Sequence, residues 1–542
     1  MRKLLVLLLV LYFGSALNAQ DIKEKKLFEG LKNQSYSIYD FKYDVKTGTY
    51  IYSPYDTVKL KSTIISNKGN SEYYSGIYSY DVLFDKSGNY YTVGTNNISD
   101  EASIYFFIKN GKALKQFNNI TFPMSIREDG VYFMANDGTK DFRVKYNIYS
   151  GEFEYGNKYD TIYLSAMRPM GGEGEPSYVL GMTKDGKDYY IACKDQKQML
   201  VIGNTEMKAY DEIYNRNTYE DPLGNIYYIA REKNSFFLVC GEKEFKKFTS
   251  VSSPLEFDKD NNPVYCASEE VAEYPTSQFV VKGNDVISRT FSKGIYEITF
   301  TPSGKVVCVG ADTLLDGTYT NTLLIDGKEV VTNASIMGVM FNKSDVPVYS
   351  SMDKDNNTYL IEGTKPISDK YSYVYDVKFS KDNKVLYLGT IYGDYEKNIP
   401  NKSYYVYGTK KYGPYEEIGN YEGQTSTNTA INDKGDLAFV ATKSVKVKGE
   451  EYPLIKSYLV CNDWKSDEFN YVSNLSTYKN DFYYLAGNVD SKGNDKNILY
   501  KNDEKLTDDY DTISELNIDT VKGVITFLAQ KKNKVFYVEI KL

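Results

Sequence analysis

The sequence predicts an all-β protein assembled from about twelve copies of one four-stranded unit. Three observations carry this prediction: a hairpin phrase recurs, its copies are about 43 residues apart, and no unit has an apolar 3.6-residue period long enough for a helix. The phrase reads "FDKSGNYYTVG" at Phe84 to Gly94, "FTPSGKVVCVG" at Phe300 to Gly310 and "FSKDNKVLYLG" at Phe379 to Gly389.

Each copy starts at an anchor residue that ends the first strand of its hairpin. The clear anchors are Phe84, Ile126, Met182, Glu220, Phe257, Phe300, Phe341, Phe379 and Ile431, and looser copies start at Tyr43, Tyr478 and Ile518. Four residues after each clear anchor stands a residue that tolerates the positive φ of a tight turn: Gly88, Gly130, Gly186, Gly224, Asn261, Gly304, Asp345, Asn383 and Gly435.

A small residue follows ten positions after the anchor, which predicts close approach by a neighbouring sheet. These residues are Gly94, Ala192, Ala230, Ala267, Gly310, Ser351, Gly389 and Ala441, with Asn136 as the exception. The second half of the unit is another hairpin, as in "LLIDGKEVV" at Leu323 to Val331. Two hairpins in about 43 residues predict a β-propeller blade.

The segments "YDVKFSKDNKVLYLG" and "YEITFTPSGKVVCVG" resemble the "FSPDGK" repeats of bacterial TolB-type, WD-like β-propellers. "KKYGPYEEI" (Lys410 to Ile418) is similar to the "GKEYGPYDEV" segment of such proteins. The resemblance spans nearly the whole mature chain and implies that the strand before each "DKSG" turn is innermost. It carries over no functional residue, since propellers bind, scaffold and catalyse alike.

The predicted organisation is a leader followed by two rings. Residues 1–19 have the basic start, apolar run and small residues of a secretory signal peptide, with cleavage after Ala19. Because propellers usually have four to eight blades, we expect two six-bladed rings, residues 20–292 and 293–542, rather than one ring of twelve. The final strand, "KVFYVEIKL", is expected to pair with an earlier element and hide its edge.

Charge and cysteine content narrow the partners. The net charge is -8 and there is no run of basic residues, so the sequence predicts no surface that attracts nucleic acid. No later segment is apolar enough to span a membrane. The odd set of cysteines, Cys193, Cys240, Cys266, Cys308 and Cys461, lies in apolar runs and is interpreted as small buried side chains; a disulfide framework or a metal cluster is the alternative.

The absence of histidine removes Ser-His-Asp and Cys-His catalysis and His-ligated zinc. We therefore predict no catalytic residue, no metal and no cofactor. Two alternatives stay open: channel carboxylates acting on a glycan, and calcium at the two "DKDNN" stretches, Asp258–Asn262 and Asp353–Asn357, where a plain turn is the competing interpretation. Turn capping also explains Asp85 and Asp185.

The expected function is that of an exported, non-enzymatic binding or scaffolding module of the cell envelope, in the periplasm, at the cell surface or outside the cell. Its expected partner is another envelope or extracellular protein; a carbohydrate-binding or carbohydrate-active propeller is the alternative, and a structural spacer a third. The loop "RPMGGEGEPS" (Arg168 to Ser177) is a candidate binding loop or a tolerated insertion. Tyrosines in strands such as "NIYYIA" are expected to pack between blades, and the single Trp464 weakens the carbohydrate interpretation.

Overall fold

The computed structural model describes residues 22–29, 38–99, 102–163, 165–167, 177–179, 181–270, 277–315, 317–333, 335–394, 397, 399–419, 429–446, 453–462, 464–489 and 493–542. The chain forms two compact units. The first unit contains Asp40–Met352 and Ile361–Pro366, and the second contains Met1–Tyr39, Asp353–Leu360 and Ile367–Leu542. The predicted signal peptide and nearly all of the Arg168 to Ser177 loop lie outside the described residues.

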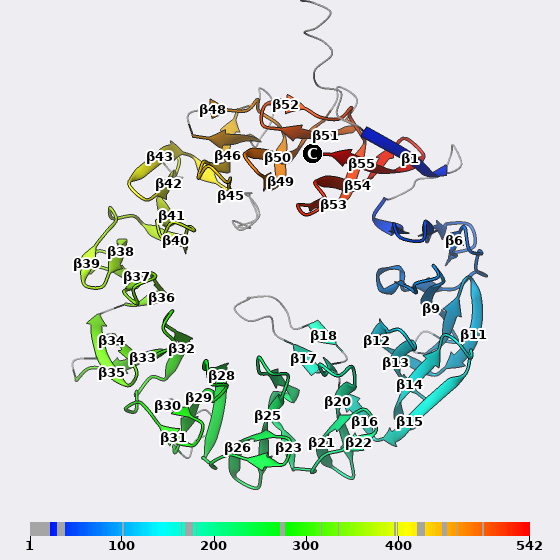
Figure 1. Cartoon of the computed structure of the whole chain (residues 1–542), viewed down its shortest axis with the longest axis horizontal. Coiled ribbons are helices and arrows are strands. Elements are labelled where there is room, and N and C mark those ends of the chain that lie inside the picture. Colours follow the sequence, from blue (N-terminus) through cyan, green and yellow to red (C-terminus); the bar gives the residue numbers. More distant parts are fainter. Residues whose placement is uncertain are drawn as a thin grey trace, which may run out of the picture. The chain divides into compact units, whose positions relative to one another are not determined.

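The first unit is a succession of antiparallel meanders, each formed by consecutive strands (Figure 1). Its strands are β2 (Phe41–Asp44), β3 (Thr49–Tyr52), β4 (Tyr55–Asp56), β5 (Lys61–Ser62) and β6 (Ile65–Ser66); β7 (Gly76–Ile77), β8 (Leu83–Phe84), β9 (Tyr90–Asn97), β10 (Ser103–Lys109) and β11 (Lys112–Phe117); β12 (Asn119–Ile126), β13 (Gly130–Asn136), β14 (Asp141–Asn147) and β15 (Phe153–Tyr159); β16 (Thr161–Tyr163), β17 (Ser165–Met167), β18 (Ser177–Val179), β19 (Gly181–Met182), β20 (Asp188–Lys194), β21 (Lys197–Ile202) and β22 (Thr205–Glu206); β23 (Glu212–Ile213), β24 (Tyr219–Glu220), β25 (Ile226–Glu232), β26 (Ser235–Cys240) and β27 (Lys243–Glu244); β28 (Ser250–Phe257), β29 (Pro263–Ser268), β30 (Phe279–Lys282) and β31 (Asp285–Val286); β32 (Ile295–Phe300), β33 (Val306–Thr313), β34 (Tyr319–Ile325) and β35 (Lys328–Asn333).

The strands β36 (Met337–Phe341), β37 (Pro347–Met352), β38 (Thr358–Glu362) and β39 (Lys365–Pro366) follow where the chain passes from one unit to the other. The second unit then contains β40 (Tyr373–Phe379), β41 (Val385–Ile391), β42 (Lys402–Tyr407) and β43 (Lys410–Tyr415); β44 (Glu417–Ile418), β45 (Thr429–Ile431), β46 (Leu437–Val445), β47 (Leu454–Cys461) and β48 (Trp464–Lys465); β49 (Tyr471–Tyr478), β50 (Asp481–Val489), β51 (Asp495–Lys501) and β52 (Glu504–Lys505); β53 (Thr512–Asp519), β54 (Val524–Lys531), β55 (Lys534–Lys541) and β1 (Ile22–Glu29). The short 3-10 helices η1 (Ile38–Asp40), η2 (Ser79–Asp81) and η3 (Tyr214–Arg216) are the only helices in the described part of the chain, and none of them is long and apolar enough to cross a membrane.

The repeat prediction is confirmed. Eleven sheets have four or five strands, and one, β2-β3-β6, has three. Two two-stranded ribbons, β4-β5 and β17-β18, lie in the connections β3–β6 and β16–β19. All twelve anchors lie in the last two residues of a first strand or in β2, as predicted. Eight of the nine turn residues have positive φ; Gly130 does not, because that hairpin turns through Glu128 and Asp129 and Gly130 already belongs to β13.

The small residue on the second strand has a fixed partner. It lies opposite an Ile or Val of the first strand in ten sheets: Ile77↔Gly94, Ile120↔Ala135, Ile162↔Ala192, Ile213↔Ala230, Val251↔Ala267, Ile295↔Gly310, Val374↔Gly389, Ile418↔Ala441, Val472↔Ala486 and Ile513↔Ala529. Asn136 is no true exception. The shorter Glu128–Asp129 turn moves the equivalent position back by one residue, to Ala135.

An aromatic residue precedes each of these Ile or Val residues, by three positions in most sheets and by four at Phe291. Its backbone pairs with the third strand of the preceding sheet, and its ring is buried between that sheet and the next. The buried members are Tyr74, Phe117, Tyr159, Tyr210, Phe248, Phe291, Tyr371, Phe469 and Tyr510. The core therefore consists of separate apolar clusters, each lying between two consecutive sheets.

The small residues are small because these rings lie against them. A Cβ atom on Gly310 would come within 2.3 Å of Phe291 Cγ, and one on Gly389 would come within 2.7 Å of the Tyr371 ring. Gly94 stands in the same relation to Tyr74, at 2.7 Å. The predicted close approach is thus made by an aromatic side chain from the preceding connection.

We predict that Gly310→Ala lowers the free energy of unfolding by about 1–3 kcal/mol, because the added methyl group overpacks the space beside Phe291. Phe291→Leu in the Gly310→Ala background should recover part of the loss, since the smaller side chain makes room. Urea unfolding of the two single variants and the double variant measures the coupling. Purely additive losses would contradict this explanation.

The last sheet is completed by the other end of the chain, as the sequence predicts. β1 pairs antiparallel with β55, from Ile22↔Ile540 to Glu29↔Lys534 (Figure 1, blue beside red). Glu24 of β1 accepts a hydrogen bond from the Tyr510 hydroxyl. Glu206 and Glu244 accept the same bond from Tyr159 and Tyr210, each at 3.0 Å, so β1 occupies an ordinary fourth-strand position.

Removal of residues 1–29 should lower the melting temperature by about 5 °C or more relative to removal of residues 1–19, because β55 loses its partner and becomes an open edge. Scanning calorimetry with light scattering measures both unfolding and association. Equal melting temperatures and equal scattering would show that β1 does not stabilise the last sheet.

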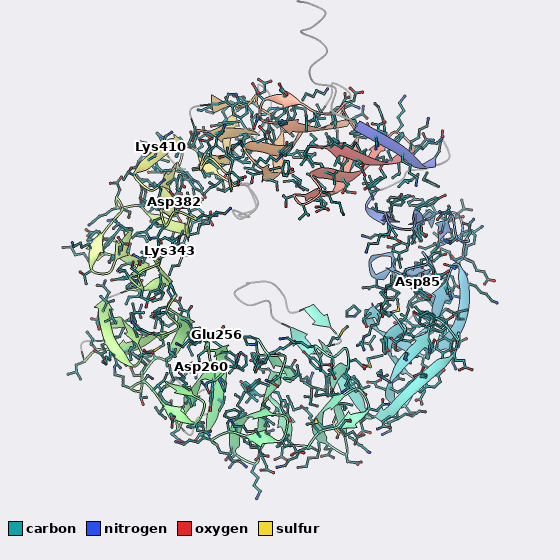
Figure 2. All side chains as sticks on the ribbon, in the orientation of Figure 1. Asp85, Glu256, Asp260, Lys343, Asp382 and Lys410 are labelled. Carbon is teal, nitrogen blue, oxygen red and sulfur yellow. The ribbon has the colours of Figure 1, made fainter. Side chains whose placement is uncertain are left out.

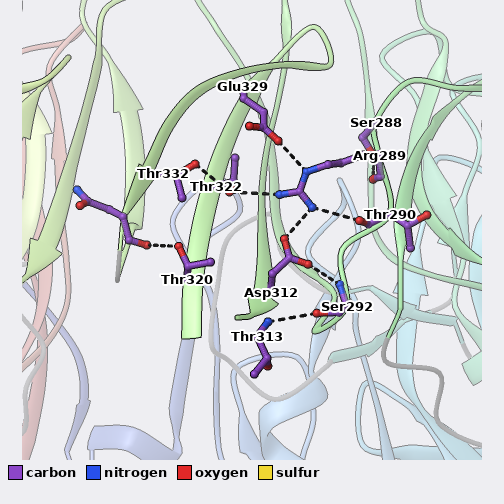
Figure 3. A network of polar contacts seen from close by, with 11 residues as sticks. Ser288, Arg289, Thr290, Ser292, Asp312, Thr313, Thr320, Thr322, Glu329 and Thr332 are labelled. Atoms are coloured by element: carbon purple, nitrogen blue, oxygen red, sulfur yellow. Dashed lines mark hydrogen bonds and ion pairs between the residues drawn. The ribbon is translucent and has the colours of Figure 1, made fainter. Parts of the chain in front are cut away.

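The division into two six-bladed rings at residue 292 stays a prediction, since it concerns ring closure. A cut there would break specific contacts within the first unit (Figure 3). Arg289 binds Glu329 through Nε and Asp312 through Nη1, each at 2.7 Å, and the Ser292 amide donates to Asp312 at 2.8 Å. Phe291 and Cys266 share an apolar cluster with Cys308.

Candidate functional site

The acidic turns bind their own backbone. Asp258 accepts hydrogen bonds from the Asp260 and Asn262 amides at 2.9 and 2.8 Å, and its side chain pairs with Lys282 at 2.7 Å. Asp353 has the same relation to Asp355, Asn357 and Lys370. Asp85 likewise caps its turn and accepts a bond from the Tyr91 hydroxyl, and Figure 2 labels Asp85 and Asp260. The "DKDNN" stretches thus have the geometry of capped turns, which matches the turn interpretation.

The tyrosine interpretation agrees with the geometry, and the interpretation of the cysteines as buried side chains holds for two of the five. In "NIYYIA", Tyr227 and Tyr228 are both buried, and each belongs to a different inter-sheet cluster. All five cysteines are free thiols; Cys266 and Cys308 are buried. Burial raises the pKa of Cys308 to about 12, so its thiol stays protonated at neutral pH and is a poor nucleophile.

The first strands carry the carboxyl groups that a glycan-cleaving interpretation requires. Burial raises the pKa of Glu256 on β28 and of Glu297 on the neighbouring β32, and it does the same for Asp81 and, in the second unit, for Glu417 (Figure 2 labels Glu256). A raised carboxyl pKa suits a general acid. Burial also raises the pKa of Asp40, and Asp40 and Asp81 lie in the 3-10 helices η1 and η2 rather than on first strands, so these five groups are the candidate acids.

Glu256 and Glu297 lie at different heights along their strands. Relative to their anchors, Phe257 and Phe300, they are offset by two residues, about 7 Å along a strand, in addition to the spacing between sheets. Glu297 also accepts a hydrogen bond from the Val339 amide at 3.2 Å. Its carboxylate is thereby turned toward β36, the next first strand, so it has a structural role in joining two sheets.

Two cavities lie in the second unit. One, of about 260 Å³, is lined by both apolar and amide side chains of the β44–β48 and β49–β52 sheets: Asn432, Asp436, Cys461, Trp464, Asn480, Phe482, Asn502 and Asp503. We call it the Trp464 groove. Asn432 is fixed by a bond from its amide to the Asn480 carbonyl at 2.9 Å, and Asn502 accepts from the Phe482 amide at 2.9 Å.

The other cavity, of about 550 Å³, lies beside β1. It is lined by Ile22, Glu24, Lys505, Leu506, Thr507, Asp508 and Tyr510. Since Glu24 and Tyr510 bind each other across it, this cavity marks the joint between β1 and the β49–β52 sheet.

The largest gathering of exposed apolar side chains in the second unit lies on one edge of three consecutive sheets. In an antiparallel meander, strand two runs back toward the start of strand one. The loop between strands two and three therefore lies on the same edge as the start of strand one. The apolar residues on this edge, which we call the hairpin face, are Tyr373, Ile391, Tyr392, Ile399, Leu454, Tyr471 and Val489. Ion pairs flank them, Lys397 with Asp394 at 2.7 Å and Lys443 with Glu468 at 2.6 Å.

The opposite edge of the same sheets has a different character. Its turns are the short, polar "KDNK" and "DKGD" hairpins, held by bonds such as Lys384 amide to Ser380 Oγ at 3.0 Å. The apolar tips were missed by sequence reasoning, although the signal was present: "IY" at Ile391 and Tyr392 follows the end of a predicted strand, where a polar turn is expected. The edge with the short polar hairpins therefore stabilises the sheets through its own turn bonds, whereas the hairpin face has exposed apolar side chains that can contact a partner.

No known protein family and no characterised protein matches the sequence. Solved structures that resemble the chain include Hsv2 of Kluyveromyces lactis (9% identity, 63% of this chain and 98% of that one, TM-score 0.22), the WD40 β-propeller domain of Doa1 (12%, 50% and 88%, 0.19) and an oligogalacturonate lyase in complex with manganese (14%, 68% and 95%, 0.25). Similarity at this level says nothing about the ligand or activity of this chain. The chain's own strand order identifies its sheets as β-propeller blades.

Proposed function

We propose that the protein is an exported, non-enzymatic propeller that binds another envelope or extracellular protein through the hairpin face. The observation that carries the proposal is the run of exposed aromatic and aliphatic side chains across three consecutive sheets, from Tyr373 to Val489. Export is supported by the sequence of residues 1–19, and action in the periplasm, at the cell surface or outside the cell follows from it.

The composition of the hairpin face supports a protein partner. Protein interfaces have an apolar, aromatic-rich centre within a polar rim. Here Tyr392, Ile391 and Ile399 lie on one long hairpin, and the Lys397–Asp394 and Lys443–Glu468 pairs supply polar groups beside them. Glu297 accepts a hydrogen bond from the Val339 amide, which favours a structural role for this carboxyl group over a role in glycan cleavage.

Tyr392→Ser combined with Ile399→Ser should reduce recovery of the partner at least tenfold in cross-linked capture from the native envelope, because each change removes exposed apolar contact area. The control is Val521→Ser, a more exposed apolar residue (95%, against 61% for Tyr392 and 49% for Ile399) in a turn on the opposite edge. Equal recovery with all three proteins, or recovery of no partner, would contradict the proposal.

A second candidate function is glycan binding in the Trp464 groove. The observation that favours it is the combination of the chain's only tryptophan with five amide or carboxylate side chains around a cavity of about 260 Å³, the size of a single sugar ring rather than of a larger ligand. Aromatic faces stack on sugar rings, and Asn and Asp side chains bind hydroxyl groups.

Because Trp464 is the only tryptophan, its fluorescence reports this groove alone. If the groove binds a sugar, titration with neutral mono- and disaccharides should shift the emission saturably, and Asn502→Ala should weaken binding about fivefold or more by removing a hydrogen-bonding side chain. An emission spectrum that no sugar changes would remove this second candidate.

A further inference from the structure

Buried polar atoms without a hydrogen-bond partner are concentrated at one place in the first unit. Among the described residues, seven such side-chain atoms occur, and five of them belong to four residues at the boundary between the β12–β15 and β16–β22 sheets. These atoms are Ser125 Oγ, Arg127 Nε, Arg127 Nη2, Arg143 Nε and Asp188 Oδ2. A buried donor without a partner destabilises the folded state, so the concentration requires a physical explanation.

The four residues form one contiguous group. Arg143 Nη1 lies 2.8 Å from Asp188 Oδ1, and Arg127 Nη1 lies 3.7 Å from the same oxygen. Arg127 Nη1 also donates to the Gly186 carbonyl at 2.6 Å. Ser125 pairs in register with Tyr132, over whose ring the Arg127 guanidinium lies at 4.2 Å.

Burial and charge single out this group. Arg143 is 8% exposed and Asp188 is 2% exposed. At the centre, two guanidinium groups face one carboxylate. The balancing negative charge lies at the rim, where Lys145 faces two carboxylates, Asp129 at 2.8 Å and Glu154 at 3.4 Å, so the six side chains together are neutral. The buried centre itself holds more positive than negative groups, which favours an added negative group there.

The free donors specify the shape of that group. Nε and Nη2 of Arg127 form one edge of its guanidinium, with two parallel N–H bonds that match two oxygens of a carboxylate or phosphate. Arg143 Nε and the Ser125 hydroxyl supply further donors. Asp188 Oδ2 requires the opposite, a ligand hydrogen to accept.

We propose that Arg127, Arg143, Ser125 and Asp188 form a binding site for a small oxyanion that also carries a hydroxyl group, either hydrogen phosphate or a hydroxycarboxylate. Two of its oxygens accept from the Arg127 edge, and its hydroxyl donates to Asp188 Oδ2. The side chain of Arg127 is 12% exposed, which makes it the most accessible charged group of the site. The site belongs to the first unit and the hairpin face to the second, so the two proposals rest on different residues.

The test is a thermal-shift and calorimetric titration of the full mature chain with phosphate, glycolate and chloride at constant ionic strength. Phosphate or glycolate should raise the melting temperature saturably, and chloride should raise it much less, because chloride has one acceptor atom for the two parallel donors and no hydrogen to donate to Asp188 Oδ2. Whichever of phosphate and glycolate binds more tightly identifies the source of the oxyanion.

Arg127→Lys keeps the charge but loses the two-donor edge, and we expect at least tenfold weaker binding. The matched control is Arg231→Lys, whose parent side chain pairs with Glu212 at 2.7 Å on the surface; its titration should equal that of the native chain. If Arg127→Lys does not fold, Ser125→Ala removes one donor without changing charge and should weaken binding severalfold. Equal responses to chloride and to both oxyanions, or unchanged binding in Arg127→Lys or in Ser125→Ala, would overturn the proposal.

Discussion

The contact on which the fold depends is an aromatic ring lying against a residue with little or no side chain. The ring comes from the connection that leaves one sheet, as Phe291 does, and the small residue belongs to the second strand of the next, as Gly310 does. A single sheet cannot bury both of its faces, so each sheet packs against the next one. The contact between the ring and the small residue sets the distance between these two sheets. The Ile or Val opposite the small residue fills the remaining space, so three positions define each joint.

The same constraint decides where function can be located. Second strands are buried on both faces, and the turns on one edge bind their own backbone, as Asp258 does. Carboxyl groups of the first strands can also link neighbouring sheets: Glu297 accepts a hydrogen bond from the Val339 amide of the next sheet. The edge that carries the long hairpins is free of these demands. Exposed apolar residues such as Tyr392 lie there, where no packing requirement of the blade explains them.

The sequence was sufficient for the repeat because its signal is local: each anchor, turn residue and small residue recurs at a nearly fixed spacing. The aromatic partner was missed because it belongs to the preceding connection, although "YDEI" at Tyr210 and "FNYV" at Phe469 repeat its spacing to the buried Ile or Val. The Arg127, Arg143 and Asp188 group could not be predicted, since it depends on the register of strands in two sheets. The hairpin face could not be predicted either, since it depends on which loops lie on the same edge of consecutive sheets.

The central claim, that an aromatic side chain lying against a small residue joins consecutive sheets where this contact occurs, is tested most directly by hydrogen exchange of a Tyr371→Ala variant. Tyr371 pairs with Thr358 of β38 and lies against Gly389 of β41. The account predicts that amides of β41 and of Thr358–Leu360 lose protection by at least tenfold, whereas those of β50 remain as in the native chain. Unchanged protection in β41, or an equal loss in β41 and β50, would contradict it.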